Sequence, residues 1–460
     1  MKDRGRAQAW KANHHRLSEP LRVVHPDAAG IDIGSEKHYV AVPLDRASEP
    51  VRCFGCLTPD LQAMARWLRA CGVTTVAMES TGVYWIPVMQ VLEAHGLEVY
   101  LVDARQAKNM PGRKTDVKDC QWLQQLHAHG MLTRAFRPAD AICVLRSYWR
   151  HRKDLVEMAS MQIQLMQKSL EQMNVQLHKV LSDITGVTGM KILRAIVDGQ
   201  RDPVLLAQMR HPLVKRSEET IAKALTGDWR PEHVFTLRQA LELYDVYQQK
   251  IHACDQEIEA YMKTLDAHGD PKDMPKFPSA KRRKNQVHFD LREQLYTWTG
   301  VDLTSLPGID AMTAQTVLSE SGMDMRRFAT EKHYSSWLGL CPNHQITGGK
   351  VRKRRTRRVH NRAAAALRVA AQSLHKSKTA LGAYYRRMRA RLGPAKAITA
   401  TAHKLAILIY RMLKYGMKYV ERGQRAYEEQ YQRRTLQMLA KRAKQMGYVM
   451  VDLRSAEIVS

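Results

Sequence analysis

The segment Ala28-Ala-Gly-Ile-Asp-Ile33 places a carboxylate inside an apolar run that reads as a β-strand. A second apolar run, Val73 to Met78, is rich in β-branched residues and ends at Glu79. Burying a carboxylate in an apolar strand is costly unless a positive group neutralises it. Two strands that each carry such a carboxylate therefore indicate a site that needs acidic oxygen atoms.

The surrounding sequence predicts an α/β layer domain over residues 27–140. Strands are expected at 28–33, 38–44, 50–56, 73–78 and 97–102, and helices at 61–70, 83–95 and 116–130. Three strands followed by alternating helices and strands are typical of such a domain. In an RNase H-like sheet of this kind, a central strand, the end of its neighbour and a flanking helix converge on one point.

Two more carboxylates stand in Lys114-Thr-Asp-Val-Lys-Asp119. Asp116 and Asp119 are three residues apart at a helix start, so they share one face of the helix, and the positive helix end favours them. Together with Asp32 and Glu79 they form a set of hard oxygen ligands suited to Mg²⁺, although the sequence cannot choose Mg²⁺ over Mn²⁺. The alternative is solvated turn carboxylates and a capping aspartate.

The charge balance indicates a polyanionic partner. The chain has 73 Lys and Arg against 45 Asp and Glu, a net charge of +28. Such an excess favours DNA or RNA, although a ribosomal or membrane-surface protein would share it. No uncharged apolar run approaches the length of a membrane span, and the N-terminus lacks a signal peptide. Seven scattered cysteines fit a reducing compartment, so we expect a cytoplasmic protein without a membrane partner.

Residues 141–268 predict two long helices, at about 142–184 and 232–267. In the second, apolar residues recur every seven positions, at Leu237, Tyr244, Ile251, Ile258 and Leu265. This period is typical of a coiled-coil seam. We expect an antiparallel helical hairpin that also serves dimerisation; the alternative is an ordinary long helix within its own domain. The remaining segments are an N-terminal arm (1–26), a basic linker (269–299), a helical domain (300–422) and a charged tail (423–460).

The sequence Thr347-Gly-Gly-Lys350 predicts a bare turn with an exposed hydroxyl. Gly348 and Gly349 would let a phosphate approach the backbone, and a hydroxyl beside concentrated positive charge can attack phosphorus. The alternative is that Thr347 only caps a turn. Eight of the thirteen residues from 350 to 362 are Lys or Arg. The residues predicted to bind nucleic acid are Lys114, Gly348, Gly349, Lys350, Arg352, Lys353, Arg354, Arg355, Arg357 and Arg358.

The stretch from Leu303 to Leu318 has two interpretations. Leu306-Pro-Gly-Ile309 and the helical pattern after it resemble a helix-hairpin-helix, whose turn can offer backbone amides to a DNA phosphate. The same residues also fit a plain helix start.

Taken together, these motifs resemble the DEDD transposases of insertion-sequence family 110, which include the Piv-type DNA invertases. The resemblance covers roughly residues 27–420. It is carried by Gly30-Ile-Asp-Ile33, Met78-Glu-Ser-Thr-Gly-Val-Tyr84, Lys114-Thr-Asp-Val-Lys-Asp119, Leu306-Pro-Gly-Ile309, Trp337-Leu-Gly-Leu340, Pro342 and Thr347-Gly-Gly-Lys350.

The resemblance implies an α/β plus α protein, with a RuvC/RNase H-like domain, a long coiled-coil hairpin and a mainly helical second catalytic domain. It implies a metal-binding tetrad of Asp32, Glu79, Asp116 and Asp119 and a hydroxyl that forms a covalent link to DNA. It further implies a structured guide RNA from the element, donor and target duplex DNA, and dimers that assemble into tetramers. The family usually has Ser where Thr347 stands, so the methyl group here restricts the rotamer of the nucleophile.

Two other functions fit parts of the sequence. A metal-only junction resolvase or nuclease would let water attack the phosphodiester and leave Thr347 structural. A non-catalytic nucleic-acid-binding protein would use the basic residues alone, but clustered carboxylates would weaken phosphate binding unless a metal neutralised them. The leading hypothesis is an RNA-guided DNA recombinase that mobilises its own insertion element.

Overall fold

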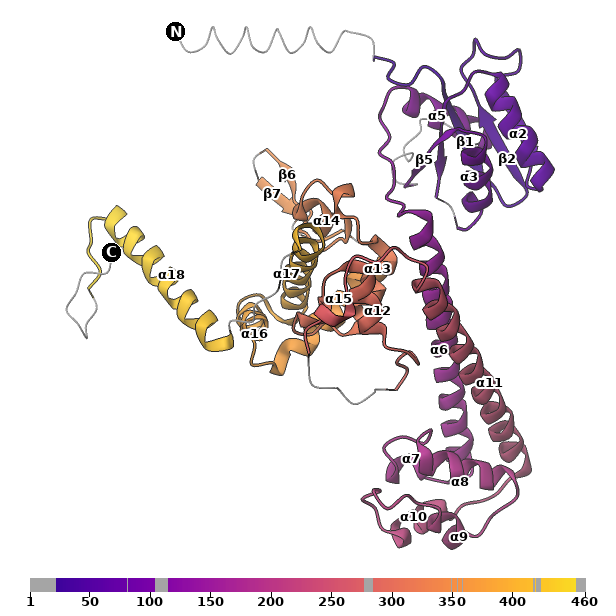
Figure 1. The fold of residues 1–460 in the computed structure, drawn as a ribbon, viewed down its shortest axis with the longest axis vertical. Coiled ribbons are helices and arrows are strands. Elements are labelled where there is room, and N and C mark those ends of the chain that lie inside the picture. Colours follow the sequence, from indigo (N-terminus) through magenta and orange to yellow (C-terminus); the bar gives the residue numbers. More distant parts are fainter. Residues whose placement is uncertain are drawn as a thin grey trace. The chain divides into compact units, whose positions relative to one another are not determined.

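The computed structural model describes residues 22–80, 82–103, 115–276, 284–348, 350–353, 355–357, 359–416, 418 and 423–451. The chain divides into two compact units, an N-terminal unit of residues 1–137 and a C-terminal unit of residues 138–460. Each unit has its own arrangement of elements (Figure 1).

The N-terminal unit is built on a five-stranded mixed sheet with the order β3-β2-β1-β4-β5. The strands are β1 (Ala28–Ile33), β2 (Lys37–Ala41), β3 (Val51–Gly55), β4 (Thr75–Glu79) and β5 (Glu98–Val102). The first three form an antiparallel meander, whereas β4 and β5 run parallel to β1. Parallel neighbours need crossover connections, and α2 (Thr58–Ala70) and α3 (Trp85–Ala94) supply them.

Helices cover both faces of this sheet. Side chains alternate along each strand, so Ile31 and Met78 pack into the core that includes α2 and α3, while Ala77 and Val102 pack with α5 (Asp116–Ala128). The helix α5 lies directly against β1. A Cβ added at Gly30 would overlap backbone atoms of α5. The mixed α/β sheet that the strand pattern predicted is thereby confirmed, and it is consistent with a RuvC-like fold.

In the C-terminal unit, α6 (Asp140–Gln172) and α11 (Pro231–Met262) pack side by side and antiparallel. The Tyr261 hydroxyl donates to the Ala141 carbonyl at 2.9 Å near one end, and the Ser169 and Thr236 hydroxyls are 3.0 Å apart near the other. Leu237, Tyr244, Ile251 and Ile258 of the predicted seam are buried. That the seam is a coiled coil which also serves dimerisation stays a prediction.

The first long helix ends twelve residues before its predicted end, at Gln172 rather than 184. Asn174 adopts a left-handed backbone with φ 54°, and the Val175 amide donates back to the Leu170 carbonyl at 2.8 Å. A left-handed residue of this kind terminates a helix. The connection to α11 contains four short helices, α7 (Leu177–Val180), α8 (Val187–Val197), α9 (Pro203–Gln208) and α10 (Glu218–Leu225).

A buried ion pair joins the two long helices. Arg152 is 3% exposed and Asp255 is fully buried, and the guanidinium donates to both carboxylate oxygens. The pair also fixes the chain that leaves the hairpin, because Arg152 donates to the Asn285 carbonyl at 3.1 Å and the His288 amide donates to Asp255 at 3.2 Å.

A second contact fastens α6 to α13 (Ala311–Ser321). The Arg150 guanidinium makes two hydrogen bonds to the Glu320 carboxylate, at 3.0 and 2.7 Å, and the Trp149 indole donates to the Thr316 hydroxyl at 3.0 Å. These contacts therefore attach the N-terminal third of α6 to α13.

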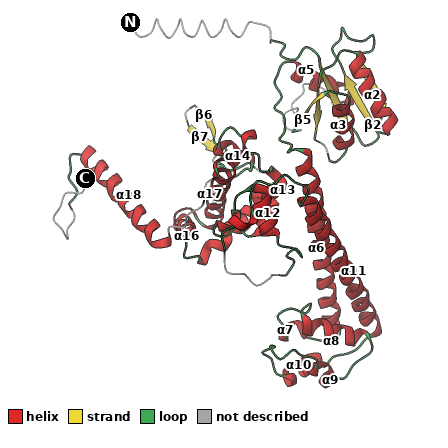
Figure 2. Ribbon diagram, in the orientation of Figure 1, coloured by secondary structure: helices red, strands yellow, loops and turns green. Residues whose placement is uncertain are grey.

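The remaining elements are mostly helical, as Figure 2 shows. They are α12 (Leu291–Thr299), α13, α14 (Glu331–Trp337), α15 (Arg362–Ser373), α16 (Ala380–Leu392), α17 (Pro394–Tyr415) and α18 (Gly423–Gln445), with short 3₁₀ turns at 271–273, 303–305, 325–327 and 374–376. A two-stranded hairpin of β6 (Gln345–Thr347) and β7 (Lys350–Lys353) interrupts them, and the sequence had not predicted strands here. Within the described ranges, no helix combines the length and apolar character needed to span a bilayer.

Candidate active site

Asp32 and Glu79 lie on neighbouring parallel strands at the same level. Ile31 of β1 is paired with Met78 of β4, so the next residue along each strand is one of the two carboxylates. Alternation places Asp32 on the face of Gly30 and Glu79 on the face of Ala77, which is the face that α5 covers. Both side chains are half-buried. The sheet thus places two carboxylates side by side, at the carboxyl ends of β1 and β4 and on the face that α5 covers.

The N-terminus of α5 brings the other two carboxylates to this face. Thr115 caps the helix by accepting a hydrogen bond from the Lys118 amide at 3.3 Å, and Asp116 and Asp119 occupy the first turn. An N-cap threonine satisfies a backbone donor that the helix leaves unpaired. The first-turn carboxylates also gain from the positive end of the helix.

The pKa values of Tyr39 and Cys120 respond to the carboxylates of the candidate site. Tyr39 is the cross-strand partner of Asp32, and the pKa of its hydroxyl is raised first by Cys53, then by burial, and also by the Asp116 carboxylate. Burial raises the pKa of the Cys120 thiol to about 12, with the charges of Asp32 and Asp119 adding to the effect. Asp32, Asp116 and Asp119 therefore all act electrostatically on the same small region.

The four carboxylates do not form a closed metal cage as their side chains stand. Among the residues that the structure describes, no group of three or more His, Cys, Asp or Glu is close enough to hold a metal ion. The donor chemistry nevertheless fits a hard divalent cation, because all four are carboxylates and approach from one strand face and one helix end. The predicted contact Lys114 lies outside the described residues.

Thr347 is the last residue of β6, at the turn of the β6–β7 hairpin. It is exposed and is paired with Lys350 across the turn. Gly348 follows with φ 55°, a left-handed conformation that an L side chain rarely adopts. Gly349 lies outside the described residues. The predicted exposure of the Thr347 hydroxyl on a glycine turn agrees with this geometry, whereas its chemical role stays a prediction.

The neighbouring serines are poor candidates for a nucleophile. Ser335 is fully buried in α14, and its hydroxyl donates to the Glu331 carbonyl at 2.8 Å. Ser336 is half-buried in the same helix, and its backbone carbonyl accepts a hydrogen bond of 2.6 Å from Arg357. Thr347, in contrast, is exposed.

The basic run surrounds the hairpin with cations. Lys350, Arg352, Arg355 and Arg357 are exposed. The base of the hairpin is anchored because the Asn343 amide donates to the Arg355 carbonyl at 2.9 Å. Of the other predicted contacts, only the backbone of Lys353 is described, and Arg354 and Arg358 lie outside the described residues.

The Pro-Gly turn before α13 faces inward on one side. Gly308 has φ 87°, and a Cβ there would lie 2.8 Å from the Ala370 carbonyl of α15. Glycine is therefore needed for packing at this position. That requirement fits the interpretation as a helix start at least as well as the interpretation as a phosphate-binding turn.

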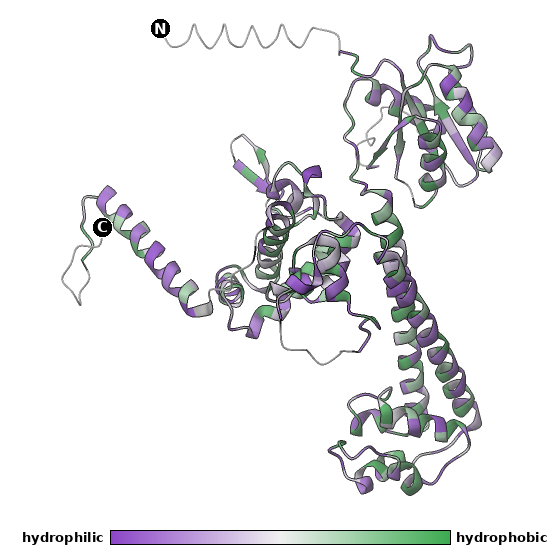
Figure 3. Cartoon of the chain, viewed as in Figure 1, coloured by the Kyte–Doolittle hydropathy of each residue, from purple (hydrophilic) through white to green (hydrophobic). Residues whose placement is uncertain are grey.

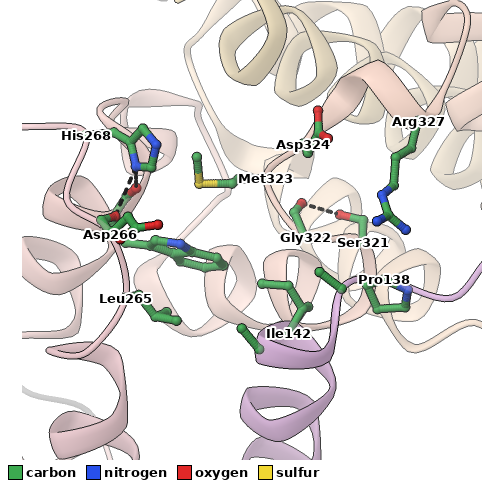
Figure 4. A pocket seen from close by; sticks show the side chains of 13 residues that line it. Pro138, Ile142, Leu265, Asp266, His268, Ser321, Gly322, Met323, Asp324 and Arg327 are labelled. Carbon is green, nitrogen blue, oxygen red and sulfur yellow. Dashed lines mark hydrogen bonds between the residues drawn. The ribbon is translucent and has the colours of Figure 1, made fainter. Parts of the chain in front are cut away.

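A cavity of about 220 Å³ lies in the C-terminal unit, and none of the predicted site residues lines it. Figure 4 shows Met323 and His268 near one another on one side and Asp324 and Arg327 on the other. The apolar part of its lining includes Ile142, Leu265 and Trp298. The candidate site residues therefore do not belong to this cavity.

The site also uses residues that the sequence analysis did not single out. Gly30 permits α5 to approach Asp32, and Tyr39 lines the same face. Gly30 stands two residues before Asp32, so the alternation of a strand already placed both on one face. That spacing was the available signal for its role. Tyr39 had no comparable signal, because strand pairing had to be known first.

Two family models match the chain. One, for DEDD-type IS110 transposases, matches residues 29–175, and the other, for transposases of the IS116/IS110/IS902 family, matches residues 300–386. Together they cover just over half of the sequence. These matches define a transposase, an enzyme that acts on DNA. More narrowly, the chain belongs to the IS110 family of DEDD transposases. We found no match among curated protein sequences.

Proposed function

We propose that this transposase mobilises its own insertion sequence by RNA-guided cleavage, exchange and rejoining of DNA strands through a covalent hydroxyl–phosphate intermediate. The observation that supports the proposal most directly is the position of Asp32 and Glu79. They lie near the ends of two adjacent parallel strands, on the face covered by the helix that begins with two more carboxylates. The chemistry of DEDD transposases as a class requires a divalent metal ion.

Asp32, Glu79, Asp116 and Asp119 would hold Mg²⁺, or Mn²⁺, in this proposal. A bound divalent ion stabilises negative charge on the attacking and leaving oxygens of a phosphodiester. The role of the chain is to orient the carboxylates: the β1–β4 register fixes two of them, and the Thr115 cap fixes the helix end that carries the others.

Thr347 would supply the nucleophile. Its oxygen forms a bond to phosphorus while a deoxyribose oxygen leaves with a proton, and rejoining reverses this exchange. Support comes from the exposure of Thr347 and from the cations Lys350 and Arg352 beside it, which would hold the phosphates. The guide RNA, the donor and target duplexes, the assembly of dimers into tetramers and a cytoplasmic location all follow from the family resemblance or the composition and stay predictions.

A plasmid recombination assay tests the nucleophile. The gene, with its native noncoding flanks, is expressed in cells, and new DNA junctions are sequenced for wild type, Thr347→Ala and Thr347→Ser. We expect Thr347→Ala to lose junctions and Thr347→Ser to keep them, since Ser carries the same hydroxyl. Normal junctions with Thr347→Ala would remove this residue from the chemistry.

The alternative is a metal-dependent nuclease in which water attacks and Thr347 is structural. It predicts free DNA ends and no covalent adduct, whereas the proposal predicts a protein–DNA adduct on denaturing gels. Asp32→Asn should abolish DNA rearrangement under either mechanism while DNA binding persists. Unchanged rearrangement in that variant would refute the metal-site assignment.

A further inference from the structure

A cluster of aromatic and cationic side chains joins α16 to the C-terminal helix α18. Apart from Tyr384, its residues lie beyond the segment that the second family model matches. We call it the Tyr–Arg cluster. It consists of Tyr384, Arg387 and Arg391 from α16 and Tyr427, Tyr431 and Arg434 from α18. Figure 3 shows that α18 is mostly hydrophilic along its length, so a buried apolar face does not explain where it docks.

Arg387 is the centre of the cluster. Its guanidinium carbon lies 3.8 Å from the ring centroid of Tyr431, 5.0 Å from that of Tyr427 and 5.7 Å from that of Tyr384. A guanidinium over an aromatic face is attracted by the ring quadrupole. Its buried atoms Nε and Nη1, and the buried Tyr427 hydroxyl, have no hydrogen-bond partner among the described residues. These atoms are buried, so the rings around the guanidinium hold it in place.

Tyr431 offers a free aromatic surface. One face of its ring carries Arg387, yet the residue is 45% exposed. Because Arg387 covers one face of the ring and much of the residue is exposed, the opposite face is where we expect a base to stack.

Each of the two helices places an arginine beside the cluster. Arg391 and Arg434 are exposed. Burial raises the pKa of Tyr384 and of Tyr427, and the charges of Arg387 and Arg391 on Tyr384, and of Arg387 and Arg434 on Tyr427, oppose that rise. On the same helix, Glu429 is paired with Arg425 at 2.9 Å.

We propose that the Tyr–Arg cluster binds an unpaired segment of nucleic acid, with a base stacked on Tyr431 and the flanking phosphates on Arg391 and Arg434. Stacking of bases on aromatic side chains beside a cationic track is how single strands are held without sequence preference. Bases in a duplex already stack on their neighbours and cannot reach such a platform. The proposal rests on the proposed function only in that it requires a nucleic-acid partner.

The test measures binding of the full-length chain to a fluorescent 20-nucleotide single strand, as DNA and as RNA, and to a duplex of the same length. Tyr431→Ala should weaken single-strand binding by about tenfold, the loss of one stacked base, and leave duplex binding within about twofold. Tyr431→Phe should bind as wild type because it keeps the ring. Arg434→Ala should lower the salt dependence by about one phosphate contact. Tyr448→Ala, at a tyrosine 67% exposed outside the cluster, is the matched control.

Each contrary outcome is decisive. Single-strand binding by Tyr431→Ala equal to wild type would overturn the proposal. An equal loss of affinity for the single strand and for the duplex would also overturn the proposal, since it would mean that the substitution had displaced α18. Tyr431→Leu keeps the apolar contact without an aromatic ring, and it therefore separates the loss of stacking from the displacement of α18. If the wild-type protein bound none of the probes, the proposed function itself would fail. If the wild-type protein bound them and Tyr431→Ala bound them equally well, only this inference would fail.

Discussion

At the scale of single residues, the candidate site depends on the missing side chain at Gly30 as much as on the carboxylate of Asp32. A side chain at position 30 would meet the backbone of α5 at Cys120 and Gln124. Without that close approach, the helix start that carries Asp116 and Asp119 would sit farther from β1. A glycine thereby sets the distance between two halves of an acidic site.

Gly30→Ala should destabilise the N-terminal unit by about 1–3 kcal/mol, the usual cost of overpacking. The added Cβ meets backbone atoms, which cannot rotate away. Urea unfolding of the full chain measures the loss. Cys120→Ala, which removes a buried side chain from the same contact without adding atoms, is the comparison. Equal stability of Gly30→Ala and wild type would show that α5 is less tightly seated than the structure indicates.

His127 should make the N-terminal unit less stable in mild acid. The side chain is 1% exposed, its Nε2 lies 2.9 Å from the Thr75 hydroxyl, and its ring stacks with His25. Burial first, and then the charge of His25, lower its pKa to about 4. The unfolded chain binds a proton near pH 6.5 but the folded chain does not. Stability is therefore fully present above pH 6.5 and falls towards pH 4, by at most about 1.4 kcal/mol per pH unit.

Urea unfolding at a series of pH values between 4 and 7 measures this dependence. His127→Gln should show a shallower slope than wild type over the same range, because the titrating group is gone. Identical slopes for the two proteins would assign the acid sensitivity to other groups.

At the scale of elements, the heptad pattern predicted the long helices but not the ion pair that fixes them. Periodicity finds apolar residues on a helix face, and Asp255 stands beside Cys254 in the seam as an apparent exception. Only the fold shows that Arg152 on the other helix meets it. The sequence analysis also missed the strands β6 and β7. They are three and four residues long, which is too short to show an alternation of apolar and polar residues.

The acidic residues of the site were accessible to sequence analysis because each stood at a strand or helix end with a readable pattern. Their proximity was not, since it depends on the β1–β4 register and on the approach of α5 over Gly30. The same holds for Tyr39. Sequence patterns thus identified the candidate residues, while the pairing of distant segments determines which of them lie on one face of the sheet.

Asp255→Ala should destabilise the hairpin by about 3–5 kcal/mol, because it leaves the Arg152 guanidinium buried without its partner. The double variant Arg152→Met with Asp255→Leu removes both charges and should recover most of that loss. Thermal unfolding followed by far-ultraviolet circular dichroism compares the three proteins. If the double variant were no more stable than Asp255→Ala, desolvation of the unpaired charge would not be the cause.

At the scale of the whole molecule, the net charge of +28 governs how the transposase meets DNA. Each cation that neutralises a phosphate releases a counterion, so affinity falls as salt rises. The exposed cations near Thr347 should contribute individually to that dependence.

Replacing Arg352 and Arg355 together with Ala should lower the slope of log affinity against log salt by about two for a duplex probe. Fluorescence anisotropy at several salt concentrations measures the slope. Lys223→Ala, at a cation already paired with Glu219 at 2.8 Å, should leave it unchanged. A loss of affinity in the double variant with no change of slope would mean that these arginines support the hairpin rather than contact phosphates.

The clamped hairpin also has a mechanical consequence. From Arg152 to Gln172, α6 runs for about 30 Å at 1.5 Å per residue, and the buried ion pair prevents the two helices from sliding past each other. The two helices would therefore move together as one stiff lever if the chain turned near Glu320. A turn of about 10° at the pivot would carry the far end through roughly 5 Å over that length, so a side-chain rearrangement at one end becomes a displacement as large as a helical turn at the other.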